Sequence, residues 1–159
     1  MSQHGFARRS NFTLVAEESD RCVYRLEASE ASQAMYPFDF RLDIEHLVEG
    51  RAVVVSAKIT NRDDRIMPFG FGFHPAFAWP LPGAIGAPHE LVLKNGAEPP
   101  MHRLSGGLVN SEALPSPFKH GRLTLDHSLF EADAMVFPEG AGTALRYGPA
   151  NGPAVEFTW

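Results

Sequence analysis

Phe38-Asp-Phe-Arg-Leu-Asp-Ile-Glu45 and Arg51-Ala-Val-Val-Val-Ser-Ala-Lys-Ile-Thr60 are the two stretches that decide the fold class of this chain. The first alternates apolar with charged residues, which is the period of a half-buried β-strand with one wet face. In the second stretch, every other residue from Val53 to Ile59 is apolar. A turn at Glu49-Gly50 joins them, so the pair predicts a β-hairpin.

Strand patterns continue on both sides of this hairpin. Residues 11–17 and 21–27 are predicted to pair across a turn around Ser19-Asp20. Further short strands are predicted over 89–94, 122–125, 134–137, 143–147 and 154–158. The turn dipeptide Asn95-Gly96 ends the first of these, and the proline- and glycine-containing residues 97–120 are expected to be irregular.

Between these groups lies Met67-Pro-Phe-Gly-Phe-Gly-Phe-His-Pro-Ala-Phe-Ala-Trp-Pro80. Its phenylalanines recur at period two from Phe69, which predicts a strand that Pro75 ends. The intervening glycines leave the other face open, as often happens where a ligand approaches. His74 at the strand end therefore indicates either a proton-transfer group in a sugar-sized site or a histidine that caps the strand.

Composition narrows the function classes. The chain has 159 residues, a net charge of −5 and one cysteine, Cys22. One domain over residues 1–159 is expected, without disulfide or cysteine-rich zinc site. The charge gives no reason to expect nucleic acid or an anionic membrane as partner. No signal peptide or membrane-length apolar run is visible, so a cytoplasmic location is the default expectation.

The predicted fold class is all-β, an antiparallel β-sandwich of about ten short strands. Twelve Phe, 14 Gly and 13 Pro argue against a helical protein, because glycine and proline both break helices.

Three segments, taken in order, resemble the aldose 1-epimerase family, also called galactose mutarotase-like proteins. They are Gln3-His-Gly-Phe-Ala-Arg8, residues 61–77 and Leu129-Phe-Glu-Ala-Asp-Ala-Met-Val-Phe137. The first segment and Tyr36-Pro-Phe-Asp-Phe40 look most like the LacX-type and hexose-6-phosphate branches. The resemblance implies an antiparallel β-supersandwich that interconverts the α and β anomers of aldoses, without metal or organic cofactor.

The resemblance also implies site residues. Anomer exchange needs a base for the C1 hydroxyl proton and an acid for the ring oxygen. His74 matches the family's general acid, and His4 matches the second active-site histidine near the ring oxygen. Arg8 would contact the sugar or its phosphate. Asp133 would accept hydrogen bonds from sugar hydroxyls.

Other interpretations of these positions stay open. First residues are usually loose, which concerns His4, and an acid such as Asp133 before a strand is often a turn or capping residue. Phe77 and Trp79 either stack on a sugar face or fill the end of the sandwich. The remaining histidines have no metal-ligand spacing and are interpreted as surface or loop groups: His46, His89, His102, His120 and His127.

The chain departs from the family pattern at both ends. Family members are nearly twice as long, and their catalytic glutamate lies in a Glu-Pro segment beyond a strand like Ala154-Val-Glu-Phe-Thr-Trp159. The setting of Glu156 does not match that base. Truncation at both ends is therefore expected, with exposed sheet edges that favour a homo-oligomer. The alternative to a mutarotase acting on a sugar or sugar phosphate is a non-catalytic carbohydrate-binding module.

Overall fold

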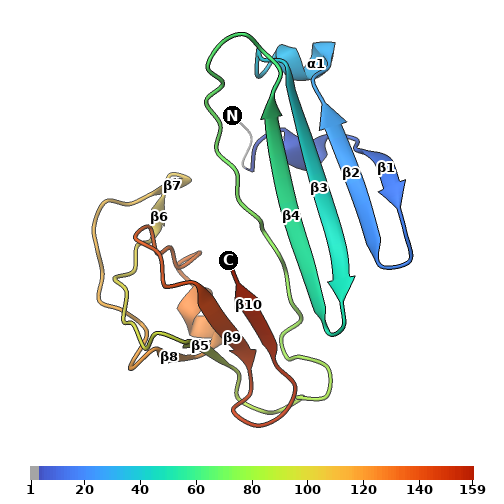
Figure 1. The fold of residues 1–159 in the computed structure, drawn as a ribbon. Helices are drawn as coiled ribbons and strands as arrows, with labels where there is room; N and C mark the ends of the chain where they lie inside the picture. The colour runs from blue at the N-terminus through green and yellow to red at the C-terminus, as the bar shows by residue number, and fades with distance from the viewer. Residues whose placement is uncertain (1–3) are drawn as a thin grey trace. The chain divides into compact units, whose positions relative to one another are not determined.

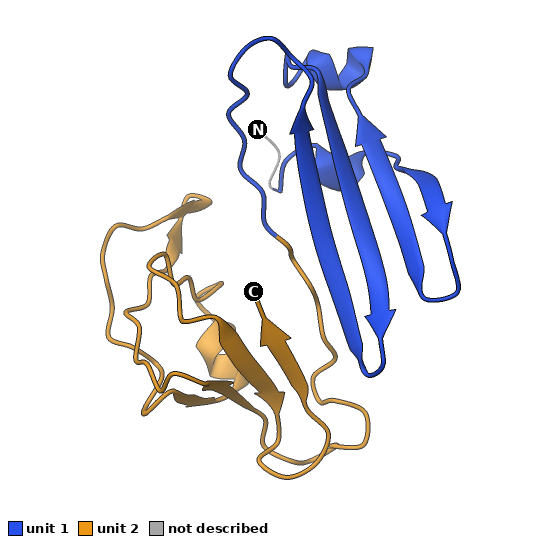
Figure 2. Ribbon diagram, in the orientation of Figure 1, with its two compact units in different colours: residues 1–72 blue, residues 73–159 orange. Residues whose placement is uncertain are grey.

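A computed structural model describes residues 4–159 of the protein (Figure 1). In this part of the chain it contains ten strands, one short α-helix and two short 3-10 helices. All strand pairs are antiparallel, which confirms the predicted all-β class. The chain divides into two compact units, unit 1 up to Gly72 and unit 2 from Phe73 to Trp159 (Figure 2). One domain over residues 1–159 stays a prediction.

Unit 1 is a sheet whose strands follow chain order, β1-β2-β3-β4. Its elements are η1 (Ala7–Arg9), β1 (Thr13–Glu17), β2 (Arg21–Glu27), α1 (Glu30–Gln33), β3 (Phe40–Glu49) and β4 (Ala52–Asn61). Both predicted strand pairs are confirmed. The turn between β3 and β4 forms at Gly50, whose φ of 62° a glycine adopts without strain.

The core of unit 1 lies on one face of this sheet. Leu26, Phe40 and Leu42 are buried there, with 4–8% of each residue exposed. Phe6 packs against them, and its ring centroid lies 5.7 Å from that of Phe40. Because the side chains of Leu26 and Leu42 are paired in register, they point to the same face. The apolar cluster therefore joins the N-terminal segment to the sheet.

The outer end of the same face is less covered. Ala57 and Ile59 pack against the core, whereas Val53 is 64% exposed and Val55 is 37% exposed. β4 is the last strand in the sheet order. The opposite face carries ion pairs, including the two hydrogen bonds from Arg25 to Asp43 at 2.7 and 3.3 Å. The alternation in the sequence thus predicts correctly which residues share a face of the sheet. It does not predict how deeply each of them is buried.

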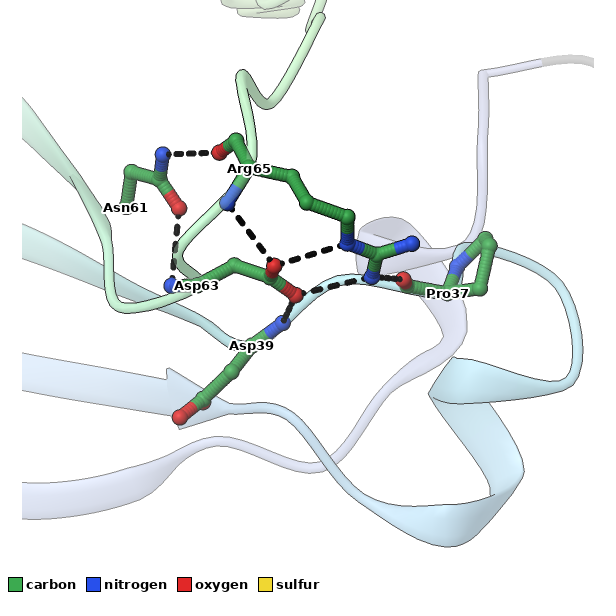
Figure 3. Close-up of polar contacts among 5 residues, drawn as sticks. All are labelled: Pro37, Asp39, Asn61, Asp63 and Arg65. Carbon is green, nitrogen blue, oxygen red and sulfur yellow. Dashed lines mark hydrogen bonds and ion pairs between the residues drawn. The ribbon is translucent and has the colours of Figure 1, made fainter.

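Asp63 holds the turn that follows β4 (Figure 3). Its carboxylate accepts hydrogen bonds from the backbone N–H of Asp39 at 3.1 Å and from the guanidinium of Arg65 at 2.9 Å. Arg65 also donates to the carbonyl of Pro37, and Asn61 accepts from the N–H of Asp63. The Arg65 guanidinium, followed by the Asp39 N–H, holds the pKa of the Asp63 carboxyl well below its usual range. The chain leaving β4 is therefore fixed to the start of β3.

The segment after this turn corrects one prediction. Residues 62–89 contain no strand, so the strand predicted from Phe69 to Pro75 is wrong. Phe69, Phe71 and Phe73 are 62%, 44% and 53% exposed. The pattern had the period of a strand, but alternate glycines supply no side chain to pack and lose more backbone entropy on ordering.

Unit 2 contains a second sheet with the order β10-β9-β5-β8 and a small hairpin of β6 and β7. Its elements are β5 (Glu90–Leu93), β6 (Leu104–Ser105), β7 (Leu108–Val109), β8 (Arg122–Thr124), η2 (His127–Phe130), β9 (Ala144–Gly148) and β10 (Val155–Thr158). Four of the five strands predicted in this region are confirmed. The fifth, over 134–137, is wrong, because only Val136 forms a bridge there, with His102.

His89 lies at the centre of a polar anchor in unit 2. It lies in the loop just before β5, which agrees with its interpretation as a loop group, but it is only 1% exposed and is therefore not a surface group. Its Nε2 accepts a hydrogen bond from the N–H of Leu81 at 3.0 Å. Its Nδ1 lies 2.9 Å from the carbonyl oxygen of Ala87 and therefore carries the ring proton. The neutral imidazole thus satisfies two buried loop groups.

Candidate functional site

The segment from Phe73 to Pro80 carries three of the predicted site residues in unit 2. His74 lies in irregular backbone and is exposed. The ring of Phe77 meets that of Phe157 edge-on, with centroids 4.7 Å apart, and Phe77 is 45% exposed. The hydroxyl of Tyr147 donates to the carbonyl of Ala78 at 2.8 Å. The end of this segment is therefore held against β9 and β10.

Trp79 packs on the 3-10 helix η2. Its ring stacks on His127 with centroids 4.4 Å apart and an interplanar angle of 28°. Phe130 lies edge-on to the same indole at 6.1 Å. Asp126 caps the N-terminus of η2, and its carboxylate accepts a hydrogen bond from the N–H of Ser128 at 2.9 Å. Hydrogen bonds from Ser128 lower the pKa of the Asp126 carboxyl, so it remains an acceptor at neutral pH.

Asp133 lies three residues after η2, in a turn. Its φ is 65°, and its carboxylate accepts a hydrogen bond from the N–H of Ala134 at 2.7 Å. Arg103 donates through Nη1 to the carbonyl of Leu129 at 3.0 Å and to that of Asp133 at 2.8 Å. Asp133 is exposed. This geometry fits a turn residue and also leaves the carboxylate accessible to a ligand.

His4 and Arg8 lie in unit 1, on either side of the half-buried Phe6. His4 and Gly5 both have a φ of 66°, and Phe6 then packs into the core. Ser10 donates to the carbonyl of Phe6 at 3.1 Å, which closes the turn around η1. His4 and Arg8 are exposed. The packing of the half-buried Phe6 against the core explains how this short motif presents two polar side chains at the surface.

Only some of the predicted site residues share a structural element in the described chain. Trp79 and Asp133 both adjoin η2, the first by stacking and the second through the hydrogen bonds of Arg103. His4 and Arg8 belong to the other unit. The roles of His4 and Arg8 therefore stay predictions.

Unit 1 contains two cavities at its surface. One of about 390 Å³ is lined by the ion-paired face of the sheet, including Arg21 and Glu45. The other, of about 770 Å³, is lined by residues of η1, β1, β2 and α1, including Phe6 and Arg9. Neither cavity is lined by His4 or Arg8. Two other arginines line the larger cavity, Arg25 and Arg9, the second of which is the neighbour of the predicted Arg8.

Glu156 lies on β10 and takes part in an ion pair. Its carboxylate lies 2.6 Å from the Nζ of Lys94. The hydrogen bond and the charge of Lys94 lower the pKa of Glu156. A carboxylate with a lowered pKa is a weaker proton acceptor, so this contact does not favour Glu156 as a catalytic base.

Among residues 4–159, no cluster of three or more His, Cys, Asp or Glu side chains could hold a metal ion. Within the same residues, no helix has the length and apolar character needed to span a membrane. The groups that support the predicted site were missed by sequence reasoning: Arg103, His127 and Tyr147. Their partners are distant in sequence, and no local pattern marks them.

The comparisons with known proteins agree with the fold. The sequence profile of the family described as Aldose 1-epimerase matches residues 1–130. Protein LacX of Lactococcus lactis subsp. lactis, in plasmid and chromosomal forms, is 26% identical over 141 residues, which are 84% of this chain and 46% of LacX. The chain thus spans about half the length of the curated relatives that it matches.

Two solved structures are similar to the whole described chain. A galactose mutarotase related enzyme from Lactobacillus acidophilus has a TM-score of 0.85 at 21% identity, over 98% of this chain and 53% of that one. A galactose mutarotase-like protein from Lactobacillus casei has a TM-score of 0.81 at 20% identity, over 98% and 55%. These likenesses confirm the predicted fold class, part of a galactose mutarotase-like antiparallel β-sandwich.

Proposed function

The chain belongs to the aldose 1-epimerase family, and from this premise we propose that it interconverts the α and β anomers of an aldose or an aldose phosphate. The observation that carries the proposal is the family match over residues 1–130, which includes His4, Arg8 and His74. Asp133 lies beyond the matched range. Its assignment is supported instead by its exposed carboxylate and its place beside η2.

His74 is the proposed general acid. Ring opening requires protonation of the ring oxygen while the C1 hydroxyl loses its proton; the C1 aldehyde then rotates, and closure reverses both transfers. Histidine suits this role because its ordinary pKa lies near neutrality. The exposure of His74 supports access by a sugar. His4 would donate or accept a hydrogen bond near the ring oxygen.

The remaining residues would bind the sugar. An exposed carboxylate such as Asp133 accepts hydrogen bonds from hydroxyl groups, and the planar guanidinium of Arg8 suits a hydroxyl or a phosphate. Phe77 and Trp79 offer apolar ring faces on which a sugar can stack. Their packing on β10 and η2 supports this role, because the rings are already held in place.

A second candidate function is sugar binding without turnover. The observation that favours it is the ion pair between Glu156 and Lys94, which engages the carboxylate nearest to the expected base position. With no base assigned within residues 4–159, the same side chains would still recognise a sugar. The two functions differ in the effect of substituting His74. In a mutarotase the rate of anomer exchange would fall, whereas in a binding module only the affinity for sugar would change.

Anomer exchange measured by NMR tests the proposal, with a panel of free and 6-phosphorylated aldoses. We expect His74→Asn to lose about 10²–10⁴ in exchange rate, the usual contribution of a general acid. His120→Asn is the matched control, since that side chain is 98% exposed and asparagine tolerates its φ of 50°. Sugar binding without acceleration by the folded chain would favour the second function. Absence of both binding and acceleration would overturn the proposal.

Self-association is a separate proposal. β4 is a ten-residue edge strand with exposed valines, and such edges pair with other chains. We expect light scattering to show an oligomer that Val53→Lys dissociates. Leu14→Lys on the opposite edge strand is the control, because β1 is shorter and its register shifts between Leu14 and Ala16. A monomeric wild-type chain would exclude this assembly.

A further inference from the structure

Arg103 makes an unusual pair of contacts in unit 2. One nitrogen, Nη1, donates to two carbonyl oxygens, that of Leu129 at 3.0 Å and that of Asp133 at 2.8 Å. These carbonyls lie four residues apart, around the end of η2 (His127–Phe130). Carbonyl groups at the end of a helix lack intrahelical donors, and a cation there satisfies them and complements their dipoles.

The backbone at Asp133 needs such support. Its φ of 65° lies in the left-handed region, which costs a residue with a side chain free energy. Two local hydrogen bonds hold the turn, from Asp133 N–H to the carbonyl of Phe130 at 3.2 Å and from Ala134 N–H to the Asp133 carboxylate at 2.7 Å. The guanidinium of Arg103 adds a charged donor on the carbonyl side of the same residue.

Arg103 is itself fixed by the strand segment that carries it. The neighbouring His102 forms a two-bond bridge with Val136, at 2.8 and 3.0 Å. The Nδ1 of His102 also lies 2.7 Å from the carbonyl oxygen of Asn110. The backbone beside Arg103 is therefore hydrogen-bonded to Val136, which follows the Asp133 turn, and the guanidinium bonds to the turn itself.

We propose that Arg103 is a positioning residue for sugar binding, which fixes the Asp133 carboxylate and keeps η2 in place beneath Trp79. This inference rests on the proposed function and assigns no contact between Arg103 and the sugar. Arg103 links the predicted binding residues Trp79 and Asp133. Trp79 stacks on His127 of η2, and the end of the same helix is bonded to Arg103.

The first test is a split between binding and turnover. We expect Arg103→Met, which keeps the length of the side chain but removes its donors, to raise the KM and Kd for sugar about tenfold. The kcat should change little, because the proposed role of Arg103 is confined to holding residues that bind the sugar. Arg103→Lys should recover part of the affinity, since an ammonium can donate but lacks the planar fork. An unchanged Kd in Arg103→Met would overturn the inference.

A double-mutant cycle separates positioning from general damage. If Arg103 acts in part through Asp133, the variant with both Arg103→Met and Asp133→Asn should lose less affinity than the sum of the two single losses, because only the contribution of η2 and Trp79 remains to be lost. Independent, additive losses of affinity would contradict the inference. Arg122→Met is the matched control, because Arg122 pairs with Glu90 at 2.8 Å on β8 of the same unit. It should leave sugar affinity unchanged.

Tryptophan emission provides a test without sugar. The chain has two tryptophans, so a Trp159→Phe background leaves Trp79 as the reporter. Arg103→Met should shift its emission to longer wavelength as η2 loosens, whereas Arg122→Met should not. A wild-type chain that binds no sugar would overturn the proposed function. Unchanged Trp79 emission in Arg103→Met would overturn the positioning of η2, whatever the result with sugars.

Discussion

The two units of the chain hold their backbones in different ways. In unit 1, strands of 5 to 10 residues pair in chain order, and the buried cluster is apolar. In unit 2, the main sheet has strands of 3 to 5 residues in the order β10-β9-β5-β8. Long connections there are fixed by polar side chains that bond to backbone groups, such as His89, Arg103 and Tyr147.

The difference shows how loops can carry a site. A strand satisfies its backbone groups by pairing, but a loop needs side chains or water for the same purpose. The segments with Trp79 and Asp133 are loops, and each is bonded by a side chain from elsewhere in unit 2. Unit 2 also has buried apolar clusters, one with Leu81 and one with Leu93, so the predictions below test how much the polar anchors add to apolar burial there.

The largest effect is expected in the apolar cluster of unit 1. Phe40→Ala should lower the free energy of unfolding by about 4 kcal/mol, because it removes a buried ring and leaves a cavity. Phe40 is 4% exposed. Urea unfolding followed by far-UV circular dichroism measures the change. Val53→Ala on the exposed end of the same face is the control, and an equal loss there would contradict this description of the core.

His89→Ala should be nearly as damaging in unit 2. We expect a loss of about 3 kcal/mol, since the buried N–H of Leu81 loses its acceptor and a cavity forms. Both tryptophans, Trp79 and Trp159, belong to unit 2, so their emission during urea unfolding reports on this unit. His120→Asn should stay close to wild type. A comparable loss in that control would mean that any histidine change disturbs the unit.

A smaller effect is expected from the hydroxyl of Tyr147. Tyr147→Phe removes the hydrogen bond to the carbonyl of Ala78 and should cost about 1 kcal/mol in unfolding free energy. Tyr24→Phe in unit 1 is the matched control, because Tyr24 is 38% exposed and water can solvate its hydroxyl. Thermal unfolding of both variants measures the difference. Equal midpoints would show that the polar anchor at Ala78 contributes nothing.

The last prediction concerns the polar turn of unit 1. The pKa of Asp63 is lowered by Arg65, so its contribution to stability is present above the ordinary Asp pKa of about 3.9. That contribution is lost as the pH falls from there toward the lowered pKa of the folded state. Asp63→Asn should therefore flatten the decline in unfolding free energy below pH 5. Urea titrations between pH 2 and 6 measure it, and identical slopes would exclude the effect.

Unit 1 was the more predictable unit. The alternation of β3 and the Glu49-Gly50 turn defined the longest hairpin, because strand period and turn chemistry agreed. Burial was harder, since it depends on which segments cover the sheet. Val53 and Ile59 share a face, yet only Ile59 packs against the core.

For the candidate site, the sequence predicted which residues take part but not the contacts that hold them. The resemblance named His74 and Asp133, but the contacts that hold the Asp133 turn link positions up to 30 residues apart. The burial of His89 could not be predicted, because its partners are backbone groups of the loop, which no side-chain pattern reveals. The Phe-Gly alternation failed for the opposite reason: it showed a period without the side chains that make a strand pack.

The edge strand β4 makes refolding of the chain sensitive to protein concentration. Between Ala52 and Asn61 it has one charged residue, Lys58, and no proline. Folding within one chain is first order, whereas pairing of this edge with another unfolded chain is second order in protein concentration. Recovery from denaturant should therefore fall steeply as the chain is concentrated, and dilution should favour the monomolecular route.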